Sequence, residues 1–466
     1  MSKNNYLIKN TIIITVGKFC TKFLSFFLLP LYTSILTTEE FGIVDLFNTS
    51  VIFIIPLLSF QIESAVFRYL IDARNNDEDK KVIISSATYF LLVMSGLLFI
   101  IYLIIQKILP QQYKVYLLLN MLAVMWSGYL FQLARGIGKT IDYAIGSFIV
   151  GSSTIIFNII YLVLLSKGAN GMFVAIFLAN TLGIVFIIFK LRLTNYLRVS
   201  SIKLESLKSM LKYSIPLIPN SFAWWAISVS DRFIVSKILG VSANGILSIA
   251  HKFPTLISTF YGLFHMAWTE SVTLNINEED GEQYITETII RVFKIFFSVV
   301  VMMLAFMPFV FPVMIKGSFS EAYTYIPLFA CATMFDVIAG LVDPIYTAKL
   351  KTKSMMSATI IVGILNVIIH LILINFIGLW ASAISSVVAY GFLVVYKYID
   401  IQKYCKVKIP KKLVYQSLIL LIIVSYSYYS KSSFIQLITL ALCILYSILQ
   451  NKGVIMGGVR SFKQKI

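Results

Sequence analysis

Charged side chains inside long apolar runs are the residues of this sequence with the clearest potential for chemistry. One charged residue at the centre of a membrane-spanning helix costs about 2.5–3.5 kcal/mol on insertion scales. Such residues therefore usually face a watery cavity or an opposite charge, where they can bind an ionic ligand, carry an ion or hold a gate. Their depth within each run ranks them as candidates.

Four cations are the candidate binding residues for an anionic ligand. Lys18 and Lys22 are four residues apart, so they share one face of a predicted helix. Lys18 lies about 9 Å from the inner edge and could snorkel back to the headgroups, whereas Lys22 lies about 15 Å deep, where the alternative is pairing with an acid. Lys252 is close to mid-depth, and Arg232 is in the outer half of its run, within reach of the headgroups.

Six further charged residues are predicted to gate the path or to couple it to an ion: Asp45, Glu63, Arg68, Asp231, Asp336 and Asp343. Glu63 and Arg68 could form an ion pair or gate, or lie on a solvated helix end. Asp336 and Asp343 are seven apart and so lie nearly on one helix face, which Pro344 should loosen. These two acids could neutralise the lysines, carry a coupling H⁺ or Na⁺, or be fixed counter-ions.

The composition explains why those charges stand out. Of the 466 residues, 59% are hydrophobic and only 13% are charged, against roughly half and a quarter in soluble domains. The net charge of +18 could suggest a nucleic-acid partner, but the basic residues lie between apolar runs, which favours membrane loops. The sequence holds no Walker A, G-x-S-x-G or H-E-x-x-H motif, so we expect no enzyme, no metal site and no cofactor.

Fourteen apolar runs are long enough to cross the hydrocarbon core, which needs about 20 residues of helix. Because the runs are continuous and do not alternate, they predict an all-α integral membrane protein. Pro56 should bend the second run. The runs cover residues 12–36, 41–66, 82–105, 115–134, 142–165, 172–190, 213–238, 242–269, 291–315, 326–347, 355–375, 379–398, 413–430 and 433–450.

The loops predict the orientation. With a cytoplasmic N-terminus, the cytoplasmic segments hold 26 lysines and arginines and the outer segments 6. Lys397 is counted in one of those cytoplasmic connections. Positive charge gathers on the cytoplasmic side of membrane proteins, so we expect both termini inside.

A weak internal repeat predicts two lobes. Ile35-Leu36-x4-Gly42-Ile43 recurs as Ile238-Leu239-x4-Gly245-Ile246. Six spans would then match the next six, as in parallel transporter repeats, unless the likeness is chance among apolar helices. The predicted division is an N-lobe over 1–200, a C-lobe over 201–405, and an extra helical hairpin with a cytoplasmic tail over 406–466.

Several motifs resemble the Wzx-type flippases of O-antigen and capsule synthesis. Their order and spacing are more specific than any one of them. The motifs are Asn10-Thr11 through Gly17-Lys18, Leu29-Pro30-Leu31-Tyr32-Thr33, Phe41-Gly42-Ile43-Val44-Asp45-Leu46, Glu63-Ser64-Ala65-Val66-Phe67-Arg68-Tyr69 and Ser230-Asp231-Arg232-Phe233-Ile234.

The resemblance implies a member of the multidrug/oligosaccharidyl-lipid/polysaccharide superfamily in a bacterial inner membrane. Such proteins have two six-helix lobes around a central cavity and move undecaprenyl-pyrophosphate-linked oligosaccharide repeat units to the outer leaflet. Membrane lipids, a polysaccharide polymerase and export machinery would be their partners. Lys18, Arg68 and Arg232 match family motif positions, whereas Lys22 and Lys252 rest on depth alone.

Two other functions stay open at this point. The first is a lipid II flippase or a multidrug exporter of the same superfamily, although an exporter of organic cations should have acids dominating its cavity. The second is a membrane-embedded polysaccharide polymerase or acyltransferase, against which the short outer loops count.

Overall fold

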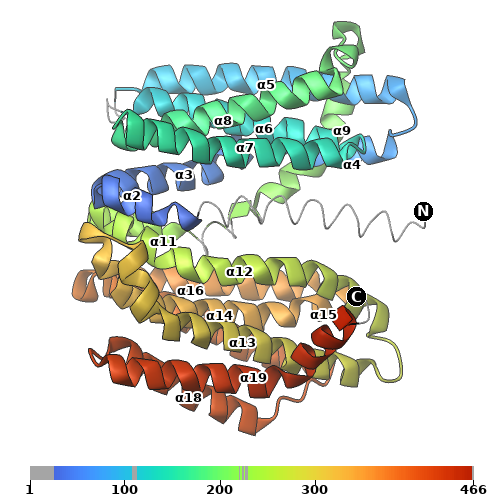
Figure 1. Ribbon diagram of the computed structural model, residues 1–466. Coiled ribbons are helices and arrows are strands. Elements are labelled where there is room, and N and C mark those ends of the chain that lie inside the picture. The colour runs from blue at the N-terminus through green and yellow to red at the C-terminus, as the bar shows by residue number, and fades with distance from the viewer. Residues whose placement is uncertain (1–25, 108–112, 220, 223–224, 226–228, 464–466) are drawn as a thin grey trace. The chain divides into compact units, whose positions relative to one another are not determined.

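The computed structural model describes residues 26–107, 113–219, 221–222, 225 and 229–463, and these residues form helices joined by short connections (Figure 1). The chain divides into two compact units, Met1–Arg232 and Phe233–Ile466. The predicted all-α membrane fold is confirmed. The predicted boundaries at residues 200 and 405 stay predictions.

Unit 1 is built around helices that pack on α4, α6 and α8. Its core includes Ile62, Leu70, Ile84, Tyr129 and Leu133, which are almost completely buried. The helices of this unit are α2 (Leu29–Ile35), α3 (Thr38–Leu58), α4 (Ile62–Asp72), α5 (Asp77–Ile105), α6 (Lys114–Gly136), α7 (Thr140–Ile159), α8 (Gly168–Leu191) and α9 (Leu204–Ser214), and α11 (Ser230–Ile238) begins at its end.

Unit 2 places α14 against α12 and α17, and α13 against the C-terminal pair of helices. Its helices are α12 (Val241–Asn275), α13 (Gly281–Met314), α14 (Ile326–Leu341), α15 (Asp343–Ala348), α16 (Thr352–Ile377), α17 (Trp380–Ile401), α18 (Lys411–Tyr429) and α19 (Ser433–Lys463). As Pro344 predicts, the helix is interrupted there: α14 ends at Leu341 and α15 begins at Asp343.

Among the described residues, eleven segments are long and apolar enough to cross a membrane, and each overlaps a predicted run. The run over 12–36 lies largely outside the described residues, and the run over 213–238 lies partly outside them. The run over 242–269 forms α12, which is long enough but more polar than the eleven segments. The total of fourteen therefore stays a prediction.

The predicted single run over 41–66 is wrong, because two helices meet there at a sharp corner. Phe60 and Gln61 adopt left-handed backbone conformations, with φ of 50° and 52°. Such a conformation costs a non-glycine residue roughly 1–2 kcal/mol. The Gln61 side-chain amide offsets that cost by donating to the Leu217 carbonyl and the Ser221 hydroxyl. The corner follows Pro56 by one turn and places Glu63 and Arg68 on a separate helix.

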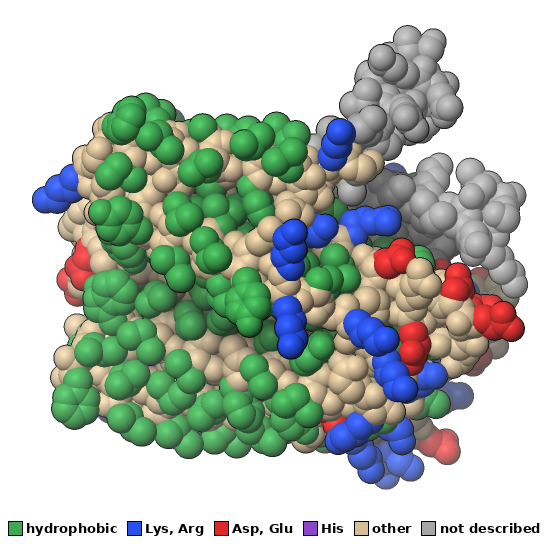
Figure 2. Space-filling model, turned by 90° about the horizontal axis from the view of Figure 1, so that it is seen from below, with side chains coloured by type: hydrophobic (Ala, Val, Ile, Leu, Met, Phe, Trp, Pro, Cys, Tyr) green, Lys and Arg blue, Asp and Glu red, His purple; other side chains and the backbone are tan. Residues whose placement is uncertain are grey.

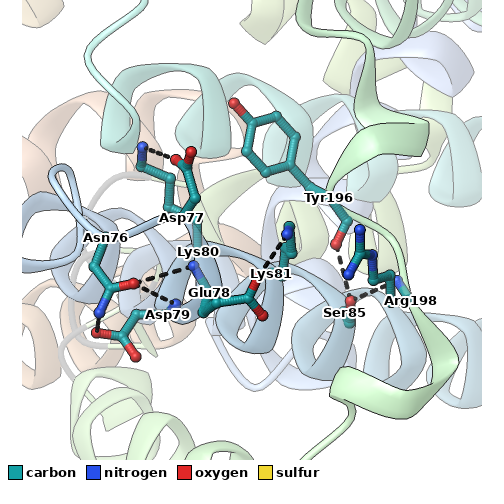
Figure 3. Close-up of polar contacts among 9 residues, drawn as sticks. All are labelled: Asn76, Asp77, Glu78, Asp79, Lys80, Lys81, Ser85, Tyr196 and Arg198. Carbon is teal, nitrogen blue, oxygen red and sulfur yellow. Dashed lines mark hydrogen bonds and ion pairs between the residues drawn. The ribbon is translucent and has the colours of Figure 1, made fainter.

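The start of α5 is fixed by its own polar side chains (Figure 3). The Asn76 side chain accepts hydrogen bonds from the backbone amides of Glu78 and Asp79, and so caps the helix. Lys80 and Lys81 pair with Asp77 and Glu78 one turn earlier, at 2.7 and 2.6 Å.

Further along α5, Ser85 accepts from the Arg198 amide and donates to the Tyr196 carbonyl (Figure 3). The connection after α8 is thereby tied to the first turns of α5.

Glu40 joins the starts of α3 and α8. Its carboxylate accepts from the Thr37 amide, while the Thr37 hydroxyl accepts from the Glu40 amide, which is a capping box. The same carboxylate accepts from the Ala169 amide at 3.3 Å. Gly168 makes room for this contact, since a Cβ there would collide with Glu40 and its φ is +52°.

Glu40→Ala should destabilise the protein by about 1–2 kcal/mol, because it removes half of a capping box and a bond to a second helix. The apparent melting temperature of the detergent-purified protein measures the loss. Glu39→Ala is the matched control, since Glu39 occupies the same first turn but is exposed. Equal melting temperatures for the two variants would contradict this role of Glu40.

Candidate functional site

Three of the predicted site residues meet in unit 1. The Arg232 Nε donates to Asp45 Oδ2 at 2.8 Å, and its Nη1 lies 3.7 Å from Asp231 Oδ1. Asp231 also accepts from the backbone amide of Arg232. All three side chains are at most 14% exposed. Two carboxylates therefore flank one guanidinium.

The elements that hold this cluster are α3, which carries Asp45, and the first turn of α11, which carries Asp231 and Arg232. Arginine suits the position because its planar fork of donors can bind carboxylates in a fixed geometry. The same fork also binds phosphate oxygens, so an incoming anion would compete with the two acids for Arg232. The two acids can hold the Arg232 guanidinium in place while no ligand is bound, and the guanidinium can then turn to an anion that binds.

A second polar cluster lies at one end of unit 2. Lys397 Nζ is 2.5 Å from Asp343 Oδ1, and the Lys397 side chain is only 3% exposed. One turn further along α17, Asp400 accepts from the Tyr346 hydroxyl at 3.0 Å and pairs with Lys403 at 2.8 Å. The hydrogen bond and negative charge of Asp400 raise the pKa of Lys403 above its ordinary value.

Asp336 lies two turns before Asp343 on α14 and is half-buried. Within the described part of the chain it makes no hydrogen bond or close ion pair, and the charge with the largest effect on it is that of Lys397. Lys397 therefore stands as the cation that compensates the acids of α14 and α15.

Counting Lys397 among the cytoplasmic loop residues was wrong, because it is buried within α17. Two signals pointed to it: it falls inside the predicted run over 379–398, and Asp400 is three residues away on the same helix face. The long basic stretch that follows obscured both signals. Asp343 thus pairs with a lysine that was not among the candidate cations.

The other predicted residues are separate from these clusters. Lys18 and Lys22 lie outside the described residues. Lys252 is half-buried in α12, next to His251, whose ring lies 3.9 Å from that of Phe329. Glu63 lies partly buried in the first turn of α4, where the helix dipole favours an acid.

Of the alternatives left open for Glu63 and Arg68, the ion pair between them is wrong. Arg68 pairs instead with Asp72 at 2.7 Å, four residues later on the exposed side of α4. A spacing of five residues turns two side chains about 140° apart on a helix, so Glu63 and Arg68 face different surroundings.

Lys397→Met should lower the free energy of unfolding by about 3 kcal/mol, which is the lower end of the range for breaking a buried ion pair. The reason is that Asp343 loses its cation but keeps some contact with water. Adding Asp343→Asn should recover part of the loss. Melting temperature and monodisperse yield of the purified variants measure both effects. Lys403→Met is the control, since its pair with Asp400 has a 68% exposed lysine and exposed pairs contribute at most about 1 kcal/mol. A Lys397→Met protein as stable as the Lys403→Met protein would contradict the role of Lys397.

Known proteins share this fold at low sequence identity. A structure described as "Lipid II flippase MurJ, inward closed conformation" matches with a TM-score of 0.68 and 17% identity, covering 96% of this chain and 100% of that one. An inward-facing multidrug resistance MATE family transporter of the MOP superfamily matches with a TM-score of 0.63 and 16% identity, covering 82% and 95%. At these identities the likeness concerns the fold.

The sequence itself identifies the family. No curated protein matches the chain. Residues 7–269, more than half of the chain, match the family described as "Polysaccharide biosynthesis protein". The matched range includes the Asp45–Asp231–Arg232 cluster and Lys252. The chain is therefore a multi-pass membrane protein that belongs to the polysaccharide biosynthesis protein family of Wzx-type flippases.

Proposed function

We propose that this protein moves undecaprenyl-pyrophosphate-linked oligosaccharide repeat units from the cytoplasmic to the outer leaflet during capsule, O-antigen or exopolysaccharide synthesis. One observation carries the proposal: a chain of a polysaccharide biosynthesis family consists of membrane-spanning helices with short connections. Within the described residues, no separate domain outside the spans is present to house glycosyl-transfer chemistry. Transport across the bilayer is the step of polysaccharide synthesis that suits such a chain.

The charges give this transport a physical basis. A pyrophosphate with attached sugars cannot cross about 30 Å of hydrocarbon unaided. Lys18, Lys22, Arg232 and Lys252 would bind it through charge-assisted hydrogen bonds. Asp45 and Asp231 support this role for Arg232, because they hold the guanidinium ready while no anion is bound. The lipid tail would stay in the bilayer during alternating access.

The energy source and the surroundings are also part of the proposal. Glu63, Arg68, Asp336 and Asp343 would gate the path or bind a coupling H⁺ or Na⁺. The protein would lie in the bacterial inner membrane with both termini in the cytoplasm. A polysaccharide polymerase and export machinery would receive the translocated units.

Lys22→Ala and Lys252→Ala should each reduce flipping of a fluorescent undecaprenyl-pyrophosphate oligosaccharide at least tenfold, since a charge-assisted hydrogen bond contributes about 1.5–3 kcal/mol. Purified protein in vesicles, with an impermeant quencher of the outer fluorophore, measures the rate. Lys431→Ala is the control, because Lys431 is an exposed residue between α18 and α19.

The same vesicles separate the alternatives. Full flipping by both variants would overturn the cationic site. Faster movement of lipid II than of the oligosaccharide lipid would favour a lipid II flippase, and export of an organic cation would favour a multidrug exporter. Glycan extension or acyl transfer by the purified protein would favour a membrane-embedded enzyme.

A further inference from the structure

Unit 2 contains an apolar groove that none of the predicted site residues lines. A cavity of about 220 Å³ lies between α13, α14, α17 and α18, and every side chain that lines it is apolar except Ser417. An adjoining cavity of about 440 Å³ shares five of these lining residues: Ile289, Ile338, Val394, Ile409 and Val414. We call the two together the α18 groove.

The α18 groove is open to the surroundings of the protein. Val414, Tyr415 and Leu418 line it and are 43%, 64% and 48% exposed. Helix α18 packs mainly against α13, which leaves the space toward α14 and α17 unfilled. Hydrophobic side chains are spread over the molecular face that Figure 2 draws, as expected of a surface in contact with lipid.

The length of the groove matches one leaflet of a bilayer. Its wall on α13 runs from Ile289 to Val300, which is about 16 Å at 1.5 Å per residue. Half of a hydrocarbon core of about 30 Å is about 15 Å. An extended polypeptide segment would bring backbone amides and carbonyls that this apolar wall cannot satisfy. An acyl chain has no such groups and fits the length.

One end of the groove is basic. Lys411 lines the mouth, and Lys406, Lys408 and Lys412 are close to it in the sequence and exposed. Within the described residues Lys411 forms no ion pair with an acid, so its charge is available to a ligand. Figure 2 shows lysine and arginine side chains toward one end of the face it draws, together with acidic ones. Basic pockets between membrane helices are typical binding sites for acidic lipid headgroups.

We propose that the α18 groove binds an anionic phospholipid of the surrounding membrane, with an acyl chain against α13 and α14 and the phosphate at Lys411. The undecaprenyl tail of the proposed substrate is a poorer occupant, because it is much longer than a groove of one leaflet's depth. The inference does not depend on the proposed function, since neither Arg232 nor Lys252 lines the groove.

The test compares two lipids that have the same tails and different charges. Native mass spectrometry of the full-length protein in detergent, titrated with dioleoylphosphatidylglycerol or dioleoylphosphatidylcholine, counts the bound lipids. We expect one saturable site that prefers phosphatidylglycerol. Lys411→Gln should weaken it about fivefold, the effect of one lysine near an anionic lipid surface. Lys431→Gln makes the same change in charge at an exposed residue beyond the other end of α18 and should leave it unchanged.

A second pair of variants tests the acyl chain. Val414→Trp should fill the groove and reduce phosphatidylglycerol binding, whereas Ile419→Trp, at a 59% exposed position of the same helix that does not line the groove, should not. Equal melting temperatures would show that all four variants fold.

Three results would overturn the proposal: equal binding of the two lipids, equal effects of the two glutamine variants, or displacement of phosphatidylglycerol by a lower concentration of undecaprenyl phosphate. The last result would assign the groove to an isoprenoid chain.

Discussion

A charge that leaves water must meet an opposite charge, and this constraint organises the interior of both units. Isolated ions in an apolar medium are so unfavourable that buried charges in proteins are paired or neutralised. Arg232 meets two acids, and Lys397 compensates the acids of α14 and α15. The helices can then be almost wholly apolar elsewhere, because the few charges that function requires are held by one another.

The two clusters differ in how readily their cation can leave its acids. Arg232 lies between two acids, and its guanidinium can also bind the oxygens of an incoming phosphate. Lys397 is nearly inaccessible, and its loss leaves acids without compensation. The first arrangement suits exchange with a ligand, and the second suits a fixed structural role.

Much of the fold could be predicted from the sequence, because continuous apolar runs of this length form helices in a membrane. The corner at Phe60 and Gln61 could not, since it depends on an amide side chain meeting Leu217 and Ser221, more than 150 residues away. The site was predictable only in part, because a sequence shows the depth of a charged residue in its apolar run but not its partners. Asp45 and Arg232 were singled out by depth and motif, but Lys397 was hidden by the loop lysines that follow it.

The length of α12 has a consequence for the side of the membrane on which it ends. It runs unbroken from Val241 to Asn275, about 52 Å at 1.5 Å per residue, which exceeds a hydrocarbon core of about 30 Å. Its partner α13 is almost as long. Both helices are therefore longer than the hydrocarbon core requires, and one end of the pair extends beyond it. The connection between the two helices carries Glu278, Glu279 and Asp280, and these acids suit a position in water rather than among anionic headgroups.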